Sequence, residues 1–175
     1  MRPIFAFVGL IALLACGTPD LDDPKLSDEK LNLEEFFDGR SVAYGQFQDV
    51  LGRVQRRFKV NIEGDWNGET LVLDERFSYS DGSTERRVWT LTKTGADSWS
   101  GTAPGVQGKA VGLESGDTFN WKYTIDLPKA SGSGTLRVSF DDWMWLLEDG
   151  RLLNRAFMRQ SGIKVGEATI FFEKK

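Results

Sequence analysis

The stretch TLVLDERFSYSDGSTERRVWTLT, residues 70 to 92, decides the fold class of this chain. Apolar and polar residues alternate on both sides of a central Ser-Asp-Gly, and this period of two is typical of half-buried antiparallel strands. A three-residue loop with glycine in the left-handed position is a favoured connection between two such strands. The stretch therefore predicts a β-hairpin whose loop is residues 80–82.

The length of the loop sets the register of this hairpin. A three-residue loop places Glu75 opposite Arg87 and Leu73 opposite Trp89. A two-residue turn would instead place Glu75 opposite Val88 and mix the apolar with the polar face, so matching of the faces favours the longer loop. Glu75 and Arg87 then interrupt the apolar, core-facing row of each strand, and we predict a cross-strand ion pair between them.

Two interpretations of this pair are open at the level of the sequence. The first is a structural ion pair, since removing one partner of a buried pair typically costs about 3–5 kcal/mol. The second is a polar spot that fixes the headgroup of a ligand inside an otherwise apolar interior.

The same alternation recurs along the chain. It covers residues 58–62, 119–127 and 136–140, and turn signals such as KTGADS, ASGSG and EDGR separate the apolar segments. We count about nine or ten strands and no helical stretch long enough for a βαβ crossover. The pattern favours a barrel or a sandwich, and the succession of hairpins favours the barrel because closure removes exposed sheet edges.

A short helix or turn is expected before the strands, in SDEKLNLEEFFDG, residues 27–39. Ser27 is a candidate N-cap, and Leu33, Phe36 and Phe37 form an apolar face before the element ends at the glycine.

A second charged interruption lies in FDDWMWLL, residues 140–147. Strand parity places Asp142 inward and Asp141 outward, unless a bulge at the two aspartates resets the phase. An inward carboxylate in an apolar region needs a hydrogen-bond donor, and Arg155 on the following strand is the nearest candidate. Because consecutive strand residues point to opposite faces, the two aspartates are a poor pair for acid–base catalysis.

Tryptophan is abundant, with six residues in the chain. Trp89 and Trp121 fall on inward rows, where large aromatic side chains either line an apolar cavity or fill the core. Trp143 and Trp145 fall on the outward row, where a protein partner could contact them.

The N-terminal residues indicate a processed and anchored chain. Residues 4–14 (IFAFVGLIALL) are an apolar run, shorter than the roughly 20 residues of a membrane-spanning helix. The following LLAC, residues 13–16, resembles the lipobox of bacterial lipoproteins, in which the cysteine becomes the first mature residue and is lipidated. An ordinary secretory signal with an incidental cysteine is the alternative.

We therefore expect a signal peptide over residues 1–15, lipid attachment at Cys16, a flexible acidic tether over residues 16–30 and one β-barrel domain over residues 31–175. The membrane is then a partner through the lipidated cysteine. The same resemblance implies, from Gly17, an outer-membrane-anchored lipoprotein that faces the periplasm.

Composition narrows the function classes. The formal net charge is −4 and no basic cluster is present, which argues against binding nucleic acid. The chain has one cysteine and no histidine, so a disulfide within the chain, a Ser-His-Asp triad, a Cys-His nucleophile and an ordinary zinc site are excluded. No phosphate loop or dinucleotide fingerprint is present either. We expect no metal, no cofactor and no catalysis.

Several stretches together resemble a family known as domain of unknown function 3833, found in proteobacterial lipoproteins. They are RFKVNIEGDWNG (57–68), LDERFSYSDG (73–82), RRVW (86–89), FDDWMW (140–145) and NRAFMRQSGIKVGEATIFF (154–172). One departure is TAPGVQGKAVG (102–112), where the family pattern would have an acidic residue near the Pro-Gly. The resemblance implies an envelope lipoprotein with an antiparallel β-fold and no established activity.

The leading hypothesis is an all-β, antiparallel up-and-down barrel of the calycin or lipocalin-like kind that binds a hydrophobic or amphipathic ligand such as a fatty acid or lipid. The candidate ligand-binding residues are Glu75, Arg87, Trp89, Trp121, Asp142 and Arg155. A structural or interaction lipoprotein with a filled core is the alternative, and a carboxylate-based hydrolase is a remote one.

Overall fold

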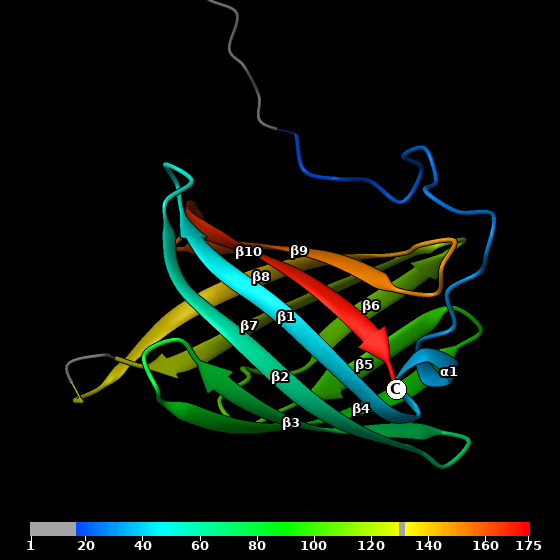
Figure 1. Cartoon of the computed structure of the whole chain (residues 1–175), viewed down its shortest axis with the longest axis horizontal. Helices are drawn as coiled ribbons and strands as arrows, with labels where there is room; N and C mark the ends of the chain where they lie inside the picture. The colour runs from blue at the N-terminus through cyan, green and yellow to red at the C-terminus, as the bar shows by residue number, and fades with distance from the viewer. Residues whose placement is uncertain (1–16, 130–131) are drawn as a thin grey trace, which may run out of the picture.

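One antiparallel sheet closes on itself to form a barrel (Figure 1). The structure is a computed structural model that describes residues 17–129 and 132–175. Its elements are α1 (Leu33–Phe37), β1 (Gly39–Asp49), β2 (Val54–Trp66), β3 (Thr70–Tyr79), β4 (Thr84–Gly95), β5 (Ser98–Thr102), β6 (Ala110–Ser115), β7 (Thr118–Pro128), β8 (Thr135–Leu146), β9 (Leu152–Gln160) and β10 (Ile163–Lys174).

The strands follow an up-and-down order. Each strand pairs antiparallel with its neighbour in sequence, and β1 pairs with both β2 and β10, which closes the ring. The predicted all-β barrel of nine or ten strands with a short N-terminal helix is confirmed. Closure leaves the ten-strand ring without a free edge, the arrangement that protects a β-protein from edge-to-edge pairing.

The β3–β4 hairpin has the predicted register. Glu75 lies opposite Arg87, and Leu73 lies opposite Trp89. The Tyr79 N–H donates to the Ser83 carbonyl over 3.0 Å, and Gly82 takes a left-handed φ of 83° in the three-residue loop. The loop length that matched the two apolar faces is therefore the one present.

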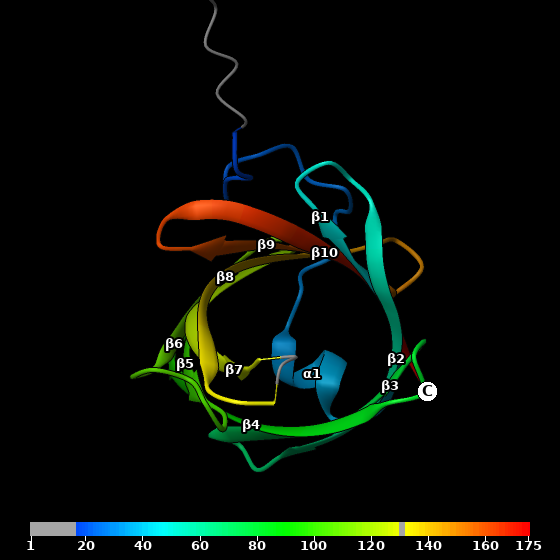
Figure 2. The ribbon, with the colours of Figure 1, turned by 90° about the vertical axis from the view of Figure 1, so that its left-hand side faces the viewer.

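The short helix α1 closes one end of the barrel. Figure 2, viewed from the opposite end, shows α1 within the ring of strands. Its Leu33, Phe36 and Phe37 are buried, as predicted, and Phe37 packs edge-on against Phe172 of β10 with 5.7 Å between ring centroids. The sequence allows this approach at Gly64 of β2, where a Cβ would lie 1.8 Å from the Phe37 carbonyl oxygen.

The expected N-cap of α1 is wrong. The helix begins at Leu33 after Asn32, whose side chain makes no capping hydrogen bond. Ser27 lies five residues further from the helix, and its Oγ accepts from the Glu29 N–H over 2.9 Å within the preceding turn. The residue typical of an N-cap therefore stabilises a local turn instead.

The segment before α1 is bonded to the barrel from Lys25 onward. The Asp117 carboxylate accepts from the N–H groups of Leu26 and Ser27 over 2.6 and 3.2 Å, and the Leu31 N–H donates to the Gly116 carbonyl over 2.9 Å. The tether that we expected to reach residue 30 thus contacts the barrel in its second half. The expected signal peptide and Cys16 lie outside the described residues.

Within the described ranges, no helix has the length and apolar character needed to cross a membrane.

Candidate functional site

The barrel encloses a cavity of about 610 Å³. Such a volume lies within the range of roughly 300–1,000 Å³ that is usual for small-molecule sites. The cavity reaches from α1, through Leu33 and Phe37, to the far strand ends, where Asp49, Pro128 and Met158 line it. The interior is therefore hollow along the barrel, with α1 as its floor.

The lining changes in character along the barrel axis. The floor layer next to α1 is apolar, and its members include Leu33, Phe37, Leu91, Phe119 and Phe172. The polar layer, further along the same strands, consists of Glu75, Arg87, Tyr123 and Asp142. The rim is mixed and includes Gln55, Arg56, Tyr79 and Glu85. A long ligand would thus meet apolar, polar and mixed walls in turn.

Glu75 and Arg87 share the cavity wall, but the ion pair expected between them is wrong. Arg87 Nη2 lies 2.7 Å from Glu85 Oε1, two residues back on the same strand and on the same face. Its guanidinium also lies 5.3 Å from the centroid of the Phe77 ring. Glu75 makes no hydrogen bond or ion pair with the described residues. The predicted strand register is correct, but the Arg87 side chain points toward Glu85 and not toward Glu75.

Burial controls the charge of Glu75. The low-polarity wall raises the pKa of its carboxyl from 4.5 to about 7, although the positive charge of Arg87 acts in the opposite direction. Arg87 itself stays charged, since the nearby negative charges keep its pKa above the usual value. Glu75 therefore titrates close to neutral pH.

Asp142 faces the same polar layer, as strand parity predicted. Asp142 is only 8% exposed, and its Oδ1 has no hydrogen-bond partner among the described residues. Burial, followed by the negative charges of Asp141 and Glu75, raises the pKa of Asp142 to about 7. The neighbouring Tyr123 hydroxyl and Arg87 offset part of this effect, and burial beside Asp142 raises the pKa of Tyr123 in turn.

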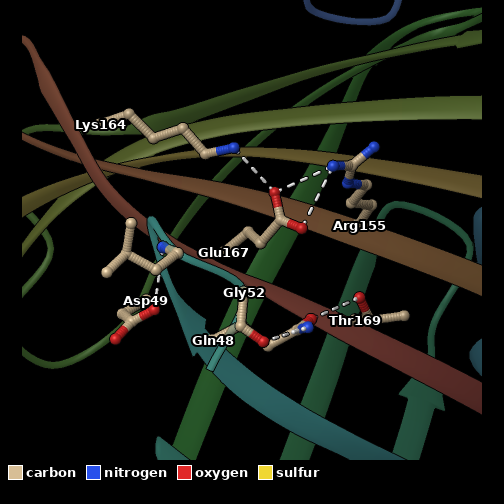
Figure 3. A network of polar contacts seen from close by, with 8 residues as sticks. Gln48, Asp49, Gly52, Arg155, Lys164, Glu167 and Thr169 are labelled. Carbon is tan, nitrogen blue, oxygen red and sulfur yellow. Dashed lines mark hydrogen bonds and ion pairs between the residues drawn. The ribbon is translucent and has the colours of Figure 1, made fainter. Parts of the chain in front are cut away.

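Arg155 is not part of the cavity, and its expected role as the donor to Asp142 is wrong. The register pairs Asp142 with Ala156, so Asn154 and Ala156 line the cavity while Arg155 points away from it. Arg155 Nη2 lies 3.0 Å from Glu167 Oε2 of β10. Figure 3 shows this pair together with Lys164, which contacts the same carboxylate. Arg155 is thus an outer-surface residue.

Trp89 and Trp121 both line the cavity at the border between its floor and its polar layer. Their rings meet edge-on at 5.7 Å, and Trp89 also meets the Tyr123 ring at 5.0 Å. Trp121 has room because the neighbouring β6 residue is Gly112, where a Cβ would lie 2.5 Å from the Trp121 ring. The two tryptophans therefore form a rigid wall beneath the polar layer.

Trp143, one of the two tryptophans predicted to face outward, is not exposed as a docking surface would be. Trp143 points away from the cavity yet is only 4% exposed, and the Lys122 ammonium lies 5.9 Å from its ring centroid. The side chains of the outer face thus cover it.

Tyr123 and Asn154 are among the cavity residues that sequence reasoning missed. Tyr123 stands in the same inward row as Trp121, so the period of two could have identified it. Asn154 is 1% exposed and donates from Nδ2 to the Trp143 carbonyl over 3.1 Å. Its neighbours Leu152, Leu153 and Ala156 are apolar on both faces of the strand, so no local signal marked its direction.

The described residues hold no group of three or more His, Cys, Asp or Glu side chains placed to bind a metal ion. The four carboxylates on the cavity wall are spread from the polar layer to the rim.

The fold and the cavity define the class of protein, a closed up-and-down β-barrel with an interior that can hold a small molecule. Within this class, the chain belongs to the family described as "Protein of unknown function (DUF3833)", whose model matches residues 10–174. The expected membership is thereby confirmed. A comparison with curated proteins finds no match.

One solved structure supports the fold. The S-type phycobiliprotein lyase CPES from Guillardia theta superposes with a TM-score of 0.61 at 10% identity, over 83% of this chain and 93% of the lyase. A redesigned β-barrel, mFAP1, bound to DFHBI, gives a TM-score of 0.41 at 10% identity, over 81% of this chain and 97% of that chain. At such low identity the lyase shows a shared barrel fold and nothing about activity.

Proposed function

We propose that this protein is a lipid-anchored envelope protein whose barrel binds a hydrophobic or amphipathic ligand of the lipid or fatty-acyl class, without catalysing a reaction on it. The cavity of about 610 Å³ is the observation that carries the proposal. Its apolar floor suits a hydrocarbon portion, and its polar layer suits a headgroup. A structural lipoprotein with a filled core would not need this space.

Native mass spectrometry of the full chain, purified from its own membranes, tests the binding. We expect a bound small molecule of lipid mass in addition to the protein. A cavity-filling variant, Ala156→Phe, should lose the ligand, because Ala156 lines the cavity and is only 3% exposed. Leu153→Phe is the matched control, since this residue lies on the outer face of the same strand and should keep the ligand.

The proposal fails if the purified chain carries no ligand and takes up none from added lipid. It also fails if both variants retain binding equally, because the ligand would then lie outside the barrel.

The proposed anchor is tested on the same material. The intact mass should include the acyl groups on Cys16, and a Cys16→Ser variant should lose both the acyl mass and its place in the membrane fraction. Acylation supplies the two lipid signals that stable anchoring requires. An unmodified Cys16 in the membrane-purified chain would refute the anchor while leaving the ligand proposal intact.

The second candidate function is hydrolysis by paired carboxyl groups. It is favoured by Glu75 and Asp142, two interior carboxyls that face one cavity and titrate near neutral pH, as a general acid and its partner can. Chromogenic ester and glycoside substrates test it. Turnover that disappears in both Glu75→Gln and Asp142→Asn would favour the hydrolase over the binding protein.

A further inference from the structure

The wall of the cavity carries more acidic than basic side chains. The cavity wall contains four carboxylates, from Asp49, Glu75, Glu85 and Asp142, against two guanidiniums, from Arg56 and Arg87. Ligand preference depends on which of these groups are already paired within the protein.

Both guanidiniums are occupied. Arg87 is bound to Glu85 at 2.7 Å, and the Tyr79 hydroxyl donates to the other oxygen of Glu85 over 2.8 Å. Arg56 lies at the rim, 2.9 Å from Asp81, with its guanidinium 3.4 Å from the centroid of the Tyr79 ring and its Nε unpaired. An incoming anion would have to displace a carboxylate from Arg87, and at the rim it would find the Nε of Arg56, which has no partner among the described residues.

The carboxylates divide into paired and unpaired groups. Asp49 is bound to Arg53 at 2.8 Å, and Glu85 is bound to Arg87. Glu75 and Asp142 have no such cation among the described residues, and Asp142 Oδ1 is buried without any partner. Buried acceptors are normally satisfied, so an unsatisfied one facing a cavity calls for a donor from outside the chain.

We infer that the ligand presents a hydrogen-bond donor, an amine or a hydroxyl, to Glu75 and Asp142, with its apolar part on the α1 floor, and that a free carboxylate or phosphate headgroup is disfavoured. This inference rests on the proposed function and narrows its ligand class. A fatty-acid anion would enter a layer that already has excess negative charge. An ammonium or hydroxyl group would instead donate hydrogen bonds to the carboxylates of Glu75 and Asp142.

Three ligands of equal chain length test the inference: dodecylamine, dodecanol and dodecanoate. Calorimetric titration uses the full chain in nanodiscs of zwitterionic lipid, with the heats of empty nanodiscs subtracted. At pH 8, where Glu75 and Asp142 are mostly ionised, we expect dodecylamine to bind at least about tenfold more tightly than dodecanoate, with dodecanol between them.

Two variants locate the preference. The double variant Glu75→Gln, Asp142→Asn should bring the amine-to-carboxylate affinity ratio within about threefold of one. The variant should fold, since it removes buried charges and keeps the side-chain shapes. Glu63→Gln is the control for the loss of a negative charge, because Glu63 is exposed on the outer face of β2 and should leave the ratio unchanged.

A third variant, Glu85→Gln, releases Arg87 from its partner and should strengthen dodecanoate binding. The inference is overturned if dodecanoate binds the unaltered chain as tightly as dodecylamine, or if the double variant keeps the preference. Binding of dodecanol and dodecanoate without dodecylamine would refute the inference and leave the proposed function standing. Binding of none of the three would refute both.

Discussion

The closed end of the barrel and the polar layer of its cavity treat buried acids differently. At the end closed by α1, Asp117 accepts from two backbone N–H groups, and Glu114 Oε1 accepts from the Leu33 N–H and the Trp99 indole over 2.8 and 3.2 Å. In the cavity, neither Glu75 nor Asp142 accepts a backbone N–H from the described residues. The closed end uses Asp117 and one oxygen of Glu114 to hold the chain together, although Glu114 Oε2 has no partner among the described residues. In the cavity, Glu75 and Asp142 stay available, whereas Asp49 and Glu85 are paired.

The difference separates structural acids from ligand-facing ones by a physical criterion. A buried acceptor that completes hydrogen bonds within the chain contributes to stability, whereas an unsatisfied one reduces stability until something binds. Substitutions in these two regions should therefore change stability in opposite directions.

The largest expected effect is at the floor. Phe37→Ala should lower the free energy of unfolding by about 3–5 kcal/mol, because Phe37 is 3% exposed and packs against Phe36 and Phe172. Urea unfolding followed by tryptophan fluorescence measures the change. A loss below about 1 kcal/mol would mean that α1 packs loosely and does not form a firm floor.

The next effect concerns the closed-end acid itself. Asp117→Ala should destabilise the protein by about 2–3 kcal/mol, since it leaves the N–H groups of Leu26 and Ser27, of which that of Ser27 is buried, without their acceptor. Hydrogen exchange should show faster exchange at those two amides. Unchanged exchange there would show that the segment before α1 does not depend on this carboxylate.

The sequence predicted the features that depend on neighbouring residues. The β3–β4 hairpin followed from one loop glycine and from two rows of alternating side chains, both of which are local. The apolar face of α1 was equally visible, but its place as the floor depends on Gly64 and Phe172, which are distant in sequence.

The errors share a cause. Arg87 has two acids within reach on its own face, and only the packed interior shows that it pairs with Glu85 instead of Glu75. Arg155 lies in a strand with apolar residues on both faces, so its direction is set by the β8–β9 register and not by a local pattern. The unpaired state of Asp142 became visible only once its surroundings were known.

A smaller effect of opposite sign is expected in the cavity. Asp142→Asn should raise the free energy of unfolding at pH 8 by about 1–2 kcal/mol, because it removes a buried charge. The pKa of about 7 in the folded protein lies above the usual value of 3.8, so this carboxyl destabilises the fold progressively as pH rises through that interval. The gain should therefore vanish near pH 4 and reach its full size above pH 7.

Other ionisable groups surround Asp142, namely Glu75, Arg87 and Tyr123 in the cavity, and the negative charge of Asp141 lies on the opposite face of the strand. The comparison is accordingly made between the variant and the unaltered chain at each pH. Asp74→Asn is the control, since the hydrogen bond from Arg86 lowers the pKa of Asp74, and its loss should destabilise the protein at neutral pH. An Asp142→Asn gain that does not depend on pH would contradict the buried-charge explanation.

The smallest effect is expected at the hairpin tips around the cavity mouth. Leu51 is 73% exposed in the β1–β2 loop and Ile163 is 72% exposed at the start of β10, so Leu51→Ser and Ile163→Ser should each change stability by less than about 0.5 kcal/mol. The same urea titration measures both. A substantial loss at either tip would show that the mouth is packed like the floor, and the contrast between the two ends of the barrel would then disappear.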